Sequence, residues 1–300
     1  MEAVRSKECL PGVTVTEMLA RSRRALVHAG IETGAREAVW LLEKGLKTTQ
    51  LKMFLDANRL LTQSECAEVD ALVRRRATRE PLQYILGTQE FCGLDFEVGP
   101  AVLIPRPETE LLVEEVEQAL TGMAQATIVD VGTGSGCLAV TLASILPGMR
   151  VYAVDCLADA LAIAQKNIAR HSVAATVTCL FGDLCMPLDS IGLVGRVEVI
   201  VSNPPYIAEA EWRDLQPEVR DFEPRDALFG GVAGTEVHHR LLDQAWKYLV
   251  PGGWLFMEVG RGQSEAVCRL AAQTGRYGGA SVRRDAAGIE RVIGLRSLEC

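Results

Sequence analysis

The residues best suited to chemistry in this 300-residue chain are Asn203-Pro204-Pro205-Tyr206. They directly follow the apolar run 197–201, where a buried parallel strand is expected to release the chain into a loop. Two successive prolines lack N–H groups and hold φ near about −65°, so the tetrapeptide is a stiff turn. The turn leaves the Asn203 amide and the Pro204 carbonyl free beside the Tyr206 ring. These acceptors could hold a planar NH2 group by its hydrogens; the alternative interpretation is a rigid turn with a partly buried tyrosine.

A glycine-rich turn is the second feature with chemical potential. Gly132-Thr133-Gly134-Ser135-Gly136 follows the predicted strand 127–131. Three glycines allow the backbone to come close to a ligand at a helix N-terminus, where N–H groups point outward. The spacing G-x-G-x-G differs from the dinucleotide fingerprint G-x-G-x-x-G, so a cofactor with a pyrophosphate is less favoured. An ordinary strand-to-helix turn that binds no ligand would show the same pattern of glycines.

Acidic residues at the ends of the next two predicted strands narrow the choice of ligand. Asp155 ends the strand 151–155, where its carboxylate can accept hydrogen bonds from both ribose hydroxyls. The strand 176–180 is followed by Phe181-Gly182-Asp183-Leu184, whose carboxylate and apolar flank could receive an adenine edge. A nucleoside without a diphosphate, bound across three consecutive strand ends, indicates S-adenosyl-L-methionine.

Composition and charge exclude several classes of function. A hydrophobic content of 48% with 23% charged residues is typical of a globular protein with a core, and the net charge of −8 is unfavourable for a wide phosphate-binding surface. Nine scattered cysteines without a C-x-x-C pair, and four histidines at unrelated spacing, predict no disulfide framework and no metal site. Neither a secretory signal nor an apolar run long enough for a membrane is visible, so we expect a cytoplasmic protein.

The pattern of strands and helices suggests how these residues are positioned. From about residue 111 onward strands alternate with helices, and helices are expected at 108–121, 158–170, 236–249 and 264–274. Such alternation predicts an α/β fold with a doubly wound, mainly parallel sheet. The strand ends that carry the candidate residues then lie at one edge of that sheet.

Within residues 1–80, the stretch from about 14 to 80 has a helical pattern, with capping-box spacing at Thr14 and Glu17 and again at Thr62 and Glu65. This region ends in the arginine cluster 74–76 with Arg79. The cluster is either a solvated helix end that complements the helix dipole or an electrostatic handle for an acidic or RNA-associated partner.

Residues 81–105 are expected to form a hairpin that links the two regions. Short extended pieces are predicted at 84–87, 90–91 and 94–98, interrupted by glycines. The linker leads into the segment 103–110, in which Pro107 suits the first turn of a helix.

Taken together, these segments resemble the HemK/PrmC family, the glutamine methyltransferases that modify peptide chain release factors. The likeness runs over nearly the whole chain. Asn-Pro-Pro-Tyr alone is shared with amino-methylating enzymes of adenine and guanine, whereas the segment 103–110 and the helical N-terminal region are far more specific. The likeness is carried by Arg79-Glu80-Pro81, Tyr84-Ile85, Gly87, Glu90-Phe91, 103–110, 130–136, 203–206, Glu223-Pro224, Ala227-Leu228, Gly230-Gly231, Glu258-Val259-Gly260 and Gln263.

The resemblance implies a Rossmann-like class I S-adenosylmethionine-dependent methyltransferase sheet at 106–300, a small helical substrate-docking bundle at 1–80 and a β-hairpin linker at 81–105. It implies that residues 132–136 line the methionine part of the cofactor, that Asp155 holds the ribose, and that Asp183 with Leu184 holds the adenine. The Asn203 side chain and the Pro204 carbonyl would take the amide hydrogens of the target glutamine, beside Pro205 and Tyr206. The implied substrate is the Gly-Gly-Gln motif of class I release factors.

Two other functions stay open on the sequence. The first is an amino-methyltransferase acting on the exocyclic NH2 of adenine or guanine in nucleic acid, although an aromatic content of 5% and the acidic charge disfavour a strand-binding groove, so stable nucleic-acid binding is not expected. The second is a regulatory module that binds the cofactor without catalysis. In that case Asn203-Pro204-Pro205-Tyr206 would be a packing device.

Overall fold

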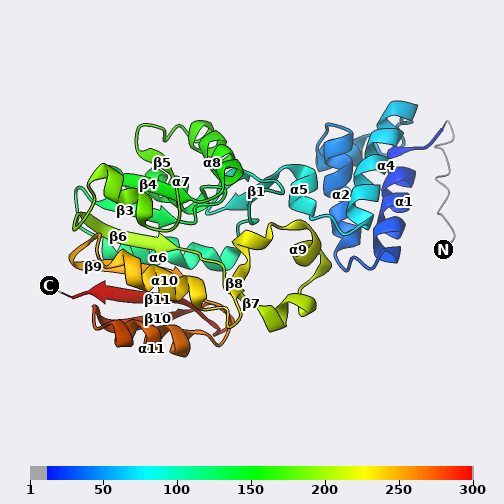
Figure 1. The fold of residues 1–300 in the computed structure, drawn as a ribbon. Helices are drawn as coiled ribbons and strands as arrows, with labels where there is room; N and C mark the ends of the chain where they lie inside the picture. The colour runs from blue at the N-terminus through cyan, green and yellow to red at the C-terminus, as the bar shows by residue number, and fades with distance from the viewer. Residues whose placement is uncertain (1–11, 299–300) are drawn as a thin grey trace. The chain divides into compact units, whose positions relative to one another are not determined.

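A computed structural model describes residues 12–298, and the chain divides into two compact units (Figure 1). Of the described residues, the first unit comprises 12–87 together with the segment Pro217–Phe222, and the second comprises 88–216 and 223–298. The described chain therefore passes between the units at three points of the sequence, near residues 87, 217 and 222.

The first unit is helical, as predicted. Its helices are α1 (Val15–His28), α2 (Gly34–Gly45), α3 (Gln50–Leu55), α4 (Gln63–Ala77), α5 (Leu82–Leu86) and α9 (Pro217–Phe222). Both predicted capping boxes form. The Thr14 and Thr62 side chains accept from the backbone N–H groups of Glu17 and Glu65, and the side chains of those glutamates accept from the backbone N–H groups of the threonines. The first four helices enclose a core that includes Met18, Leu26, Leu41, Leu42 and Val69.

The prediction of extended backbone at 84–87 is wrong, since these residues belong to α5 and its cap. Leu82, Tyr84 and Ile85 are buried, and Gly87 ends the helix in the left-handed conformation with φ of 82°. The predicted hairpin does form, but it begins at Thr88, with β1 (Thr88–Phe91) paired antiparallel to β2 (Leu94–Glu97). The short run 82–86 carries aromatic and β-branched residues, and five residues are too few for helical periodicity to be visible.

The arginine cluster is mainly structural. The guanidinium of Arg76 is buried and contacts two carboxylates, Glu37 at 2.6 Å and Glu218 at 3.0 Å. Arg79 binds the other oxygen of Glu218 at 2.8 Å, and Arg75 pairs with Glu80. The interpretation as a solvated helix end is therefore wrong for Arg76, because a buried charge of this kind requires the partners that Glu37 and Glu218 supply.

The second unit is built on a seven-stranded sheet in the order β10-β11-β9-β6-β3-β4-β5. The pairs β3–β4, β4–β5, β3–β6 and β6–β9 are parallel, and β11 is antiparallel to both of its neighbours. This arrangement confirms the predicted doubly wound, mainly parallel sheet. The strands are β3 (Thr127–Val131), β4 (Arg150–Asp155), β5 (Val177–Phe181), β6 (Val197–Ser202), β9 (Leu249–Glu258), β10 (Tyr277–Arg284) and β11 (Glu290–Ser297).

Helices cover both faces of this sheet, and the central strand β6 shows why. Its Val199 and Val201 belong to one apolar cluster while Ile200 belongs to the other, as the alternation of side chains along a strand requires. The first cluster takes in α6 (Glu110–Ala119), α7 (Cys137–Ile145) and α8 (Ala158–Arg170). The second takes in α10 (Glu236–Ala245) and α11 (Ser264–Thr274), so that a continuous core lies on each side of the strands that carry the candidate site.

Two further observations concern residues 12–298 only. None of the helices described there is long and apolar enough to cross a membrane. Among the same residues, no group of three or more histidine, cysteine, aspartate or glutamate side chains could hold a metal ion.

Candidate active site

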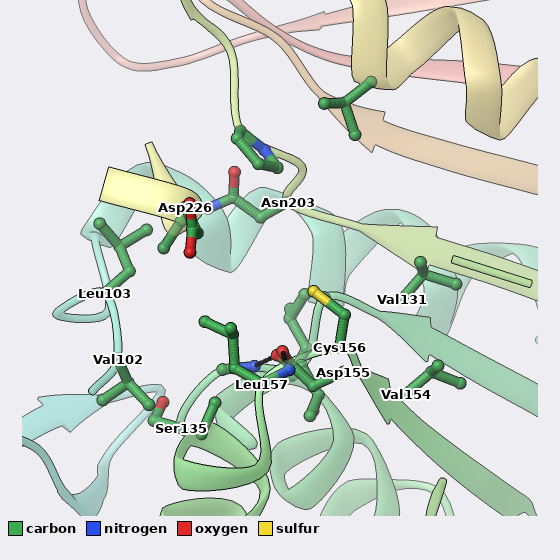
Figure 2. A pocket seen from close by; sticks show the side chains of 18 of the residues that line it. Val102, Leu103, Val131, Ser135, Val154, Asp155, Cys156, Leu157, Asn203 and Asp226 are labelled. Atoms are coloured by element: carbon green, nitrogen blue, oxygen red, sulfur yellow. Dashed lines mark hydrogen bonds between the residues drawn. The ribbon is translucent and has the colours of Figure 1, made fainter. Parts of the chain in front are cut away.

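A cavity of about 330 Å³ lies where the parallel strands β3, β4, β5 and β6 end (Figure 2). The carboxyl ends of parallel strands share one edge of a sheet, which is why residues far apart in the sequence meet here. In Figure 2, Asn203 faces the cavity from one side, and Asp155 and Leu157 face it from the other. The structure brings nine of the predicted site residues into the lining: Gly132, Thr133, Gly134, Ser135, Asp155, Asp183, Leu184, Asn203 and Pro205.

Three predicted site residues lie outside that lining. Gly136 is the N-cap of α7, with φ of 79°, and a Cβ added there would lie 3.2 Å from the Cβ of Ala164. Its glycine is therefore explained by the close approach of α8. Pro204 is buried and Tyr206 is half-buried, and neither is among the residues that line the cavity.

The glycine-rich turn has the shape of a ligand cradle. The N–H groups of Gly132 and Thr133 both donate to the Val154 carbonyl at 2.9 Å, which fixes the turn against β4. Gly132 and Gly134 have positive φ, and a Cβ built on either would meet no atom within 4 Å. The space over the turn is open on the cavity side, so the residues present fit the methionine part of the cofactor that the sequence indicates.

Asp130 supports this turn from below. Its carboxylate is fully buried and accepts from the Thr133 hydroxyl at 2.6 Å and from the Ala139 N–H at 3.2 Å. Burial raises the pKa of Asp130 to about 7, because desolvation opposes the charged form more than these two hydrogen bonds favour it.

Asp155 lies at the end of β4 and holds two loops together. Its Oδ2 accepts from the Gly134 N–H and its Oδ1 from the Leu157 N–H, both at 2.9 Å (Figure 2). Burial raises the pKa of Asp155, against the effect of the backbone hydrogen bonds. Each carboxylate oxygen has a second lone pair, so the ribose role predicted for Asp155 is compatible with this geometry.

Asp183 and Leu184 line the same cavity at the end of β5. The Asp183 carboxylate forms an ion pair with the guanidinium of Arg240 from α10. Leu184 has φ of 48°, which is unusual for a residue with a side chain. Their contact with adenine remains a prediction.

The loop after β6 is held in place by a network of buried side chains. The Nδ2 of Asn203 donates to the Thr109 hydroxyl oxygen at 3.1 Å, and that hydroxyl donates to Oε2 of Glu258 at 2.7 Å. The Tyr206 hydroxyl donates to the other oxygen of Glu258 at 3.1 Å. Burial raises the pKa of Tyr206 further above its ordinary value, so its hydroxyl is a donor at neutral pH.

The backbone of the loop is fixed as well. Gln263 donates from Nε2 to the Tyr206 carbonyl at 2.8 Å, and its Oε1 accepts from the Gly260 N–H at 2.9 Å. A Cβ added to Gly230 in β8 (Phe229–Gly231) would lie 2.7 Å from both the Pro205 carbonyl oxygen and the Tyr206 Cα. Only glycine permits this approach, so the stiff turn predicted from two prolines is packed tightly on its outer side.

Sequence reasoning missed the hydrogen bonds that join Thr109 and Glu258 to the loop after β6. Both residues stand in segments that carry the family resemblance, 103–110 and 258–260, but nothing in either segment shows that they meet. It also missed several members of the cavity lining, including Val102, Leu103, Asp226, Phe229 and Arg240. These residues come from loops and from α10, where no strand-end rule identifies them.

Comparison with solved structures agrees with this fold. The catalytic domain of hMettl16 in complex with a 3′UTR hairpin matches with a TM-score of 0.57 at 17% identity, over 76% of this chain and 82% of that one. At this identity the likeness shows the fold alone. Together with a family model described as the methyltransferase small domain, which matches residues 107–216, this fold defines a class I S-adenosylmethionine-dependent methyltransferase.

Comparison with sequence families is more specific. A family model described as the PrmC N-terminal domain matches residues 17–87, and one described as the methyltransferase small domain matches residues 107–216. Release factor glutamine methyltransferases from Geobacter sulfurreducens and Koribacter versatilis are each 44% identical to the chain over 94% of its length, covering 96% and 98% of the relatives. One from Moorella thermoacetica is 40% identical over 93% of the chain and 97% of its own length. The chain belongs to the family of release factor glutamine methyltransferases.

Proposed function

We propose that this protein transfers a methyl group from S-adenosyl-L-methionine to the side-chain amide nitrogen of the glutamine in the Gly-Gly-Gln motif of class I peptide chain release factors. The names of the relatives support the substrate. The observation that carries the proposal for this chain is that the Asn203 carboxamide, the glycine-rich turn and Asp155 line one cavity. This shared lining supports the proposal that methyl donor and acceptor amide bind next to each other.

When bound, S-adenosyl-L-methionine supplies a methyl group already activated by its positively charged sulfur. Gly132, Thr133, Gly134 and Ser135 would hold its methionine part, and Asp155 would hold the ribose hydroxyls. Positioning and electrostatic stabilisation are then the main tasks left to the protein.

The acceptor nitrogen sets the demand on Asn203. A primary amide nitrogen is a poor nucleophile because its lone pair is delocalised into the carbonyl group. If the Asn203 Oδ1 and the Pro204 carbonyl accept its two hydrogens, they fix the nitrogen and direct its lone pair toward the methyl group. Tyr206 would pack beside the substrate amide. A strong general base is unnecessary in the attacking step, since the nitrogen would be acidic once methylated and would then lose one of its hydrogens as a proton to water.

Mass spectrometry of the Gly-Gly-Gln peptide tests the assignment, after a class I release factor reacts with the protein and S-adenosyl-L-methionine. We expect one added methyl group on the glutamine with the wild type, and about 100-fold less with Asn203→Ala, because a positioning group has been removed. The affinity for the cofactor should change little. Unchanged kcat in Asn203→Ala would contradict the role of this amide.

The same assay separates the rival function. Labelled S-adenosyl-L-methionine is supplied with total RNA and DNA in place of the release factor. Methylation of nucleic acid without methylation of the factor would favour the amino-methyltransferase of adenine or guanine. A protein that binds the cofactor but labels none of these acceptors would favour the regulatory module.

The helical residues 12–80 have a role in this proposal as a docking surface for the release factor. Contacts far from the reacting glutamine supply orientation that a short loop cannot supply by itself. A class I release factor acts in translation, which fits the cytoplasmic location expected from the sequence.

A further inference from the structure

The hydrogen bonds that join Asn203 to Thr109 and Thr109 to Glu258 determine which group donates and which accepts at each contact. The hydroxyl of Thr109 donates to Oε2 of Glu258, 2.7 Å away, and this direction is the only one possible while Glu258 is ionised, because an ionised carboxylate only accepts hydrogen bonds. A hydroxyl has a single hydrogen, which this bond uses. The Thr109 oxygen can therefore only accept from Asn203, and only the Nδ2 end of the carboxamide can donate to it, at 3.1 Å.

The consequence concerns the end of the carboxamide that is left free. Rotation of an asparagine amide by half a turn exchanges an acceptor for a donor at nearly the same position. Of the side-chain hydrogen bonds that the structure gives within residues 12–298, the one to Thr109 is the bond that distinguishes the two ends of the Asn203 carboxamide. It holds Nδ2 against Thr109 and leaves Oδ1 as the acceptor.

The surroundings keep this arrangement in place. Thr109 and Glu258 are 2% and 1% exposed, so water does not compete for their hydrogen bonds. The second oxygen of Glu258 accepts from Tyr206, and its backbone carbonyl accepts from the buried His238 Nε2 at 2.8 Å. Glu258 thus holds two residues of the catalytic loop, Asn203 through Thr109 and Tyr206 directly.

We propose that Thr109 and Glu258 are positioning residues that orient the Asn203 carboxamide so that its oxygen, and not its nitrogen, meets the NH2 group of the substrate. The inference rests on the proposed function. A reversed carboxamide would direct two N–H groups at the substrate N–H groups, and the substrate amide would lose an acceptor. Neither Thr109 nor Glu258 needs to touch the reacting atoms.

The test compares Thr109→Val, which is close in shape but lacks the hydroxyl, with Thr109→Ser, which keeps it. Thr141→Val is the matched control, because Thr141 is also a buried threonine, in α7, and its hydroxyl makes no hydrogen bond to a described residue. We expect Thr109→Val to lower kcat by about 10- to 100-fold, the usual effect of losing one buried hydrogen bond. KM for the release factor and the affinity for S-adenosyl-L-methionine should stay within about twofold. Thr109→Ser should restore most of kcat, and Thr141→Val should match the wild type.

A second readout does not depend on activity. In 15N NMR spectra the side-chain NH2 of Asn203, assigned by its absence in Asn203→Asp, should exchange slowly with water in the wild type and rapidly in Thr109→Val. Unchanged exchange, or kcat within twofold of wild type in Thr109→Val, would overturn the inference. A wild type that shows the protected NH2 but methylates no release factor would support the orientation and contradict the proposed function instead.

Discussion

At the scale of single residues, binding of the methyl donor and activation of the acceptor are assigned to different side chains of one cavity. Asp155 faces the cavity from the end of β4, and Asn203 faces it from the loop after β6 (Figure 2). Since they come from different strands, their effects on binding and on kcat should be separable by mutation.

Asp155→Ala should weaken binding of S-adenosyl-L-methionine by about 10- to 100-fold, the cost of losing hydrogen bonds to a charged group. The change also frees the Gly134 and Leu157 N–H groups that the carboxylate binds. Asp155→Asn keeps one acceptor oxygen and should lose less affinity. Isothermal titration calorimetry measures the affinity of the wild type and of both variants for S-adenosyl-L-methionine. An unaltered affinity in Asp155→Ala would exclude the ribose role.

Asp130 and Glu258 should make stability depend on pH in an unusual direction. Burial raises the pKa of each to about 7, from ordinary values of 3.8 and 4.5. Between these values and pH 7 the folded protein binds protons that the unfolded chain releases. The stabilisation that each group contributes is fully present below its ordinary pKa and is lost as the pH rises through 7, at up to about 1.4 kcal/mol per pH unit for each group.

Urea denaturation between pH 5.5 and pH 8.5 measures how the free energy of unfolding depends on pH. Asp130→Asn removes one of the two titrating groups and should flatten this dependence. A wild-type free energy of unfolding that rises through pH 7 would contradict the pKa direction given for both groups. The charged and titratable groups that act on Glu258 are Tyr206, Arg291 and Glu108, and His238 binds its carbonyl.

Activity should follow the opposite trend, because the orientation of Asn203 needs the ionised form of Glu258. A protonated Glu258 could donate to Thr109, whose hydroxyl would then be free to donate to the Asn203 oxygen and reverse the carboxamide. On the proposed orientation of Asn203, the ionised carboxylate lowers folding stability but is needed for chemistry, which is a common compromise at functional sites.

At the scale of secondary-structure elements, the sequence predicted the elements that have strong local signals. The helices at 158–170 and 264–274 and the strand at 127–131 have the expected bounds. The helix α5 was missed because its five residues are held by burial of Leu82, Tyr84 and Ile85, which is a tertiary effect.

Local sequence patterns do not predict which residues far apart in the sequence are in contact. Thr109 and Glu258 are separated by 149 positions and Arg76 and Glu218 by 142. The types of these residues are ordinary for exposed surfaces, so composition and spacing give no sign that they are buried together. The predicted edge of the sheet, in contrast, followed from strand order alone and did collect most of the candidate site.

We expect the helix α9, which carries Glu218, to be stabilised by the buried charge of Arg76. Arg76→Met leaves the carboxylates of Glu37 and Glu218 without this partner, and removal of one member of a buried ion pair typically costs about 3–5 kcal/mol. Arg75→Met is the matched control, since the exposed pair of Arg75 with Glu80 should contribute less than about 1 kcal/mol. Thermal denaturation followed by circular dichroism compares the two variants. Equal, small losses would show that the Arg76 pairs are not important for stability.

At the scale of the whole molecule, the division into two units fits a methyltransferase whose substrate is a protein. Residues 17–87 match the PrmC N-terminal family model, while the cavity belongs entirely to the second unit. If the helical unit docks the release factor, the intact factor should be methylated with a higher kcat/KM than a short Gly-Gly-Gln peptide. Equal efficiencies would contradict the docking role without affecting the assignment of the cavity.

The most direct test of the central claim is the site of methylation in an intact class I release factor. The protein is incubated with the factor and S-adenosyl-L-methionine, and the Gly-Gly-Gln peptide is sequenced by mass spectrometry, with Asn203→Ala in parallel. One methyl group on the glutamine side-chain amide, largely absent with Asn203→Ala, is the predicted result. An unmodified glutamine with the wild-type protein, or a methyl group at another position, would contradict the account.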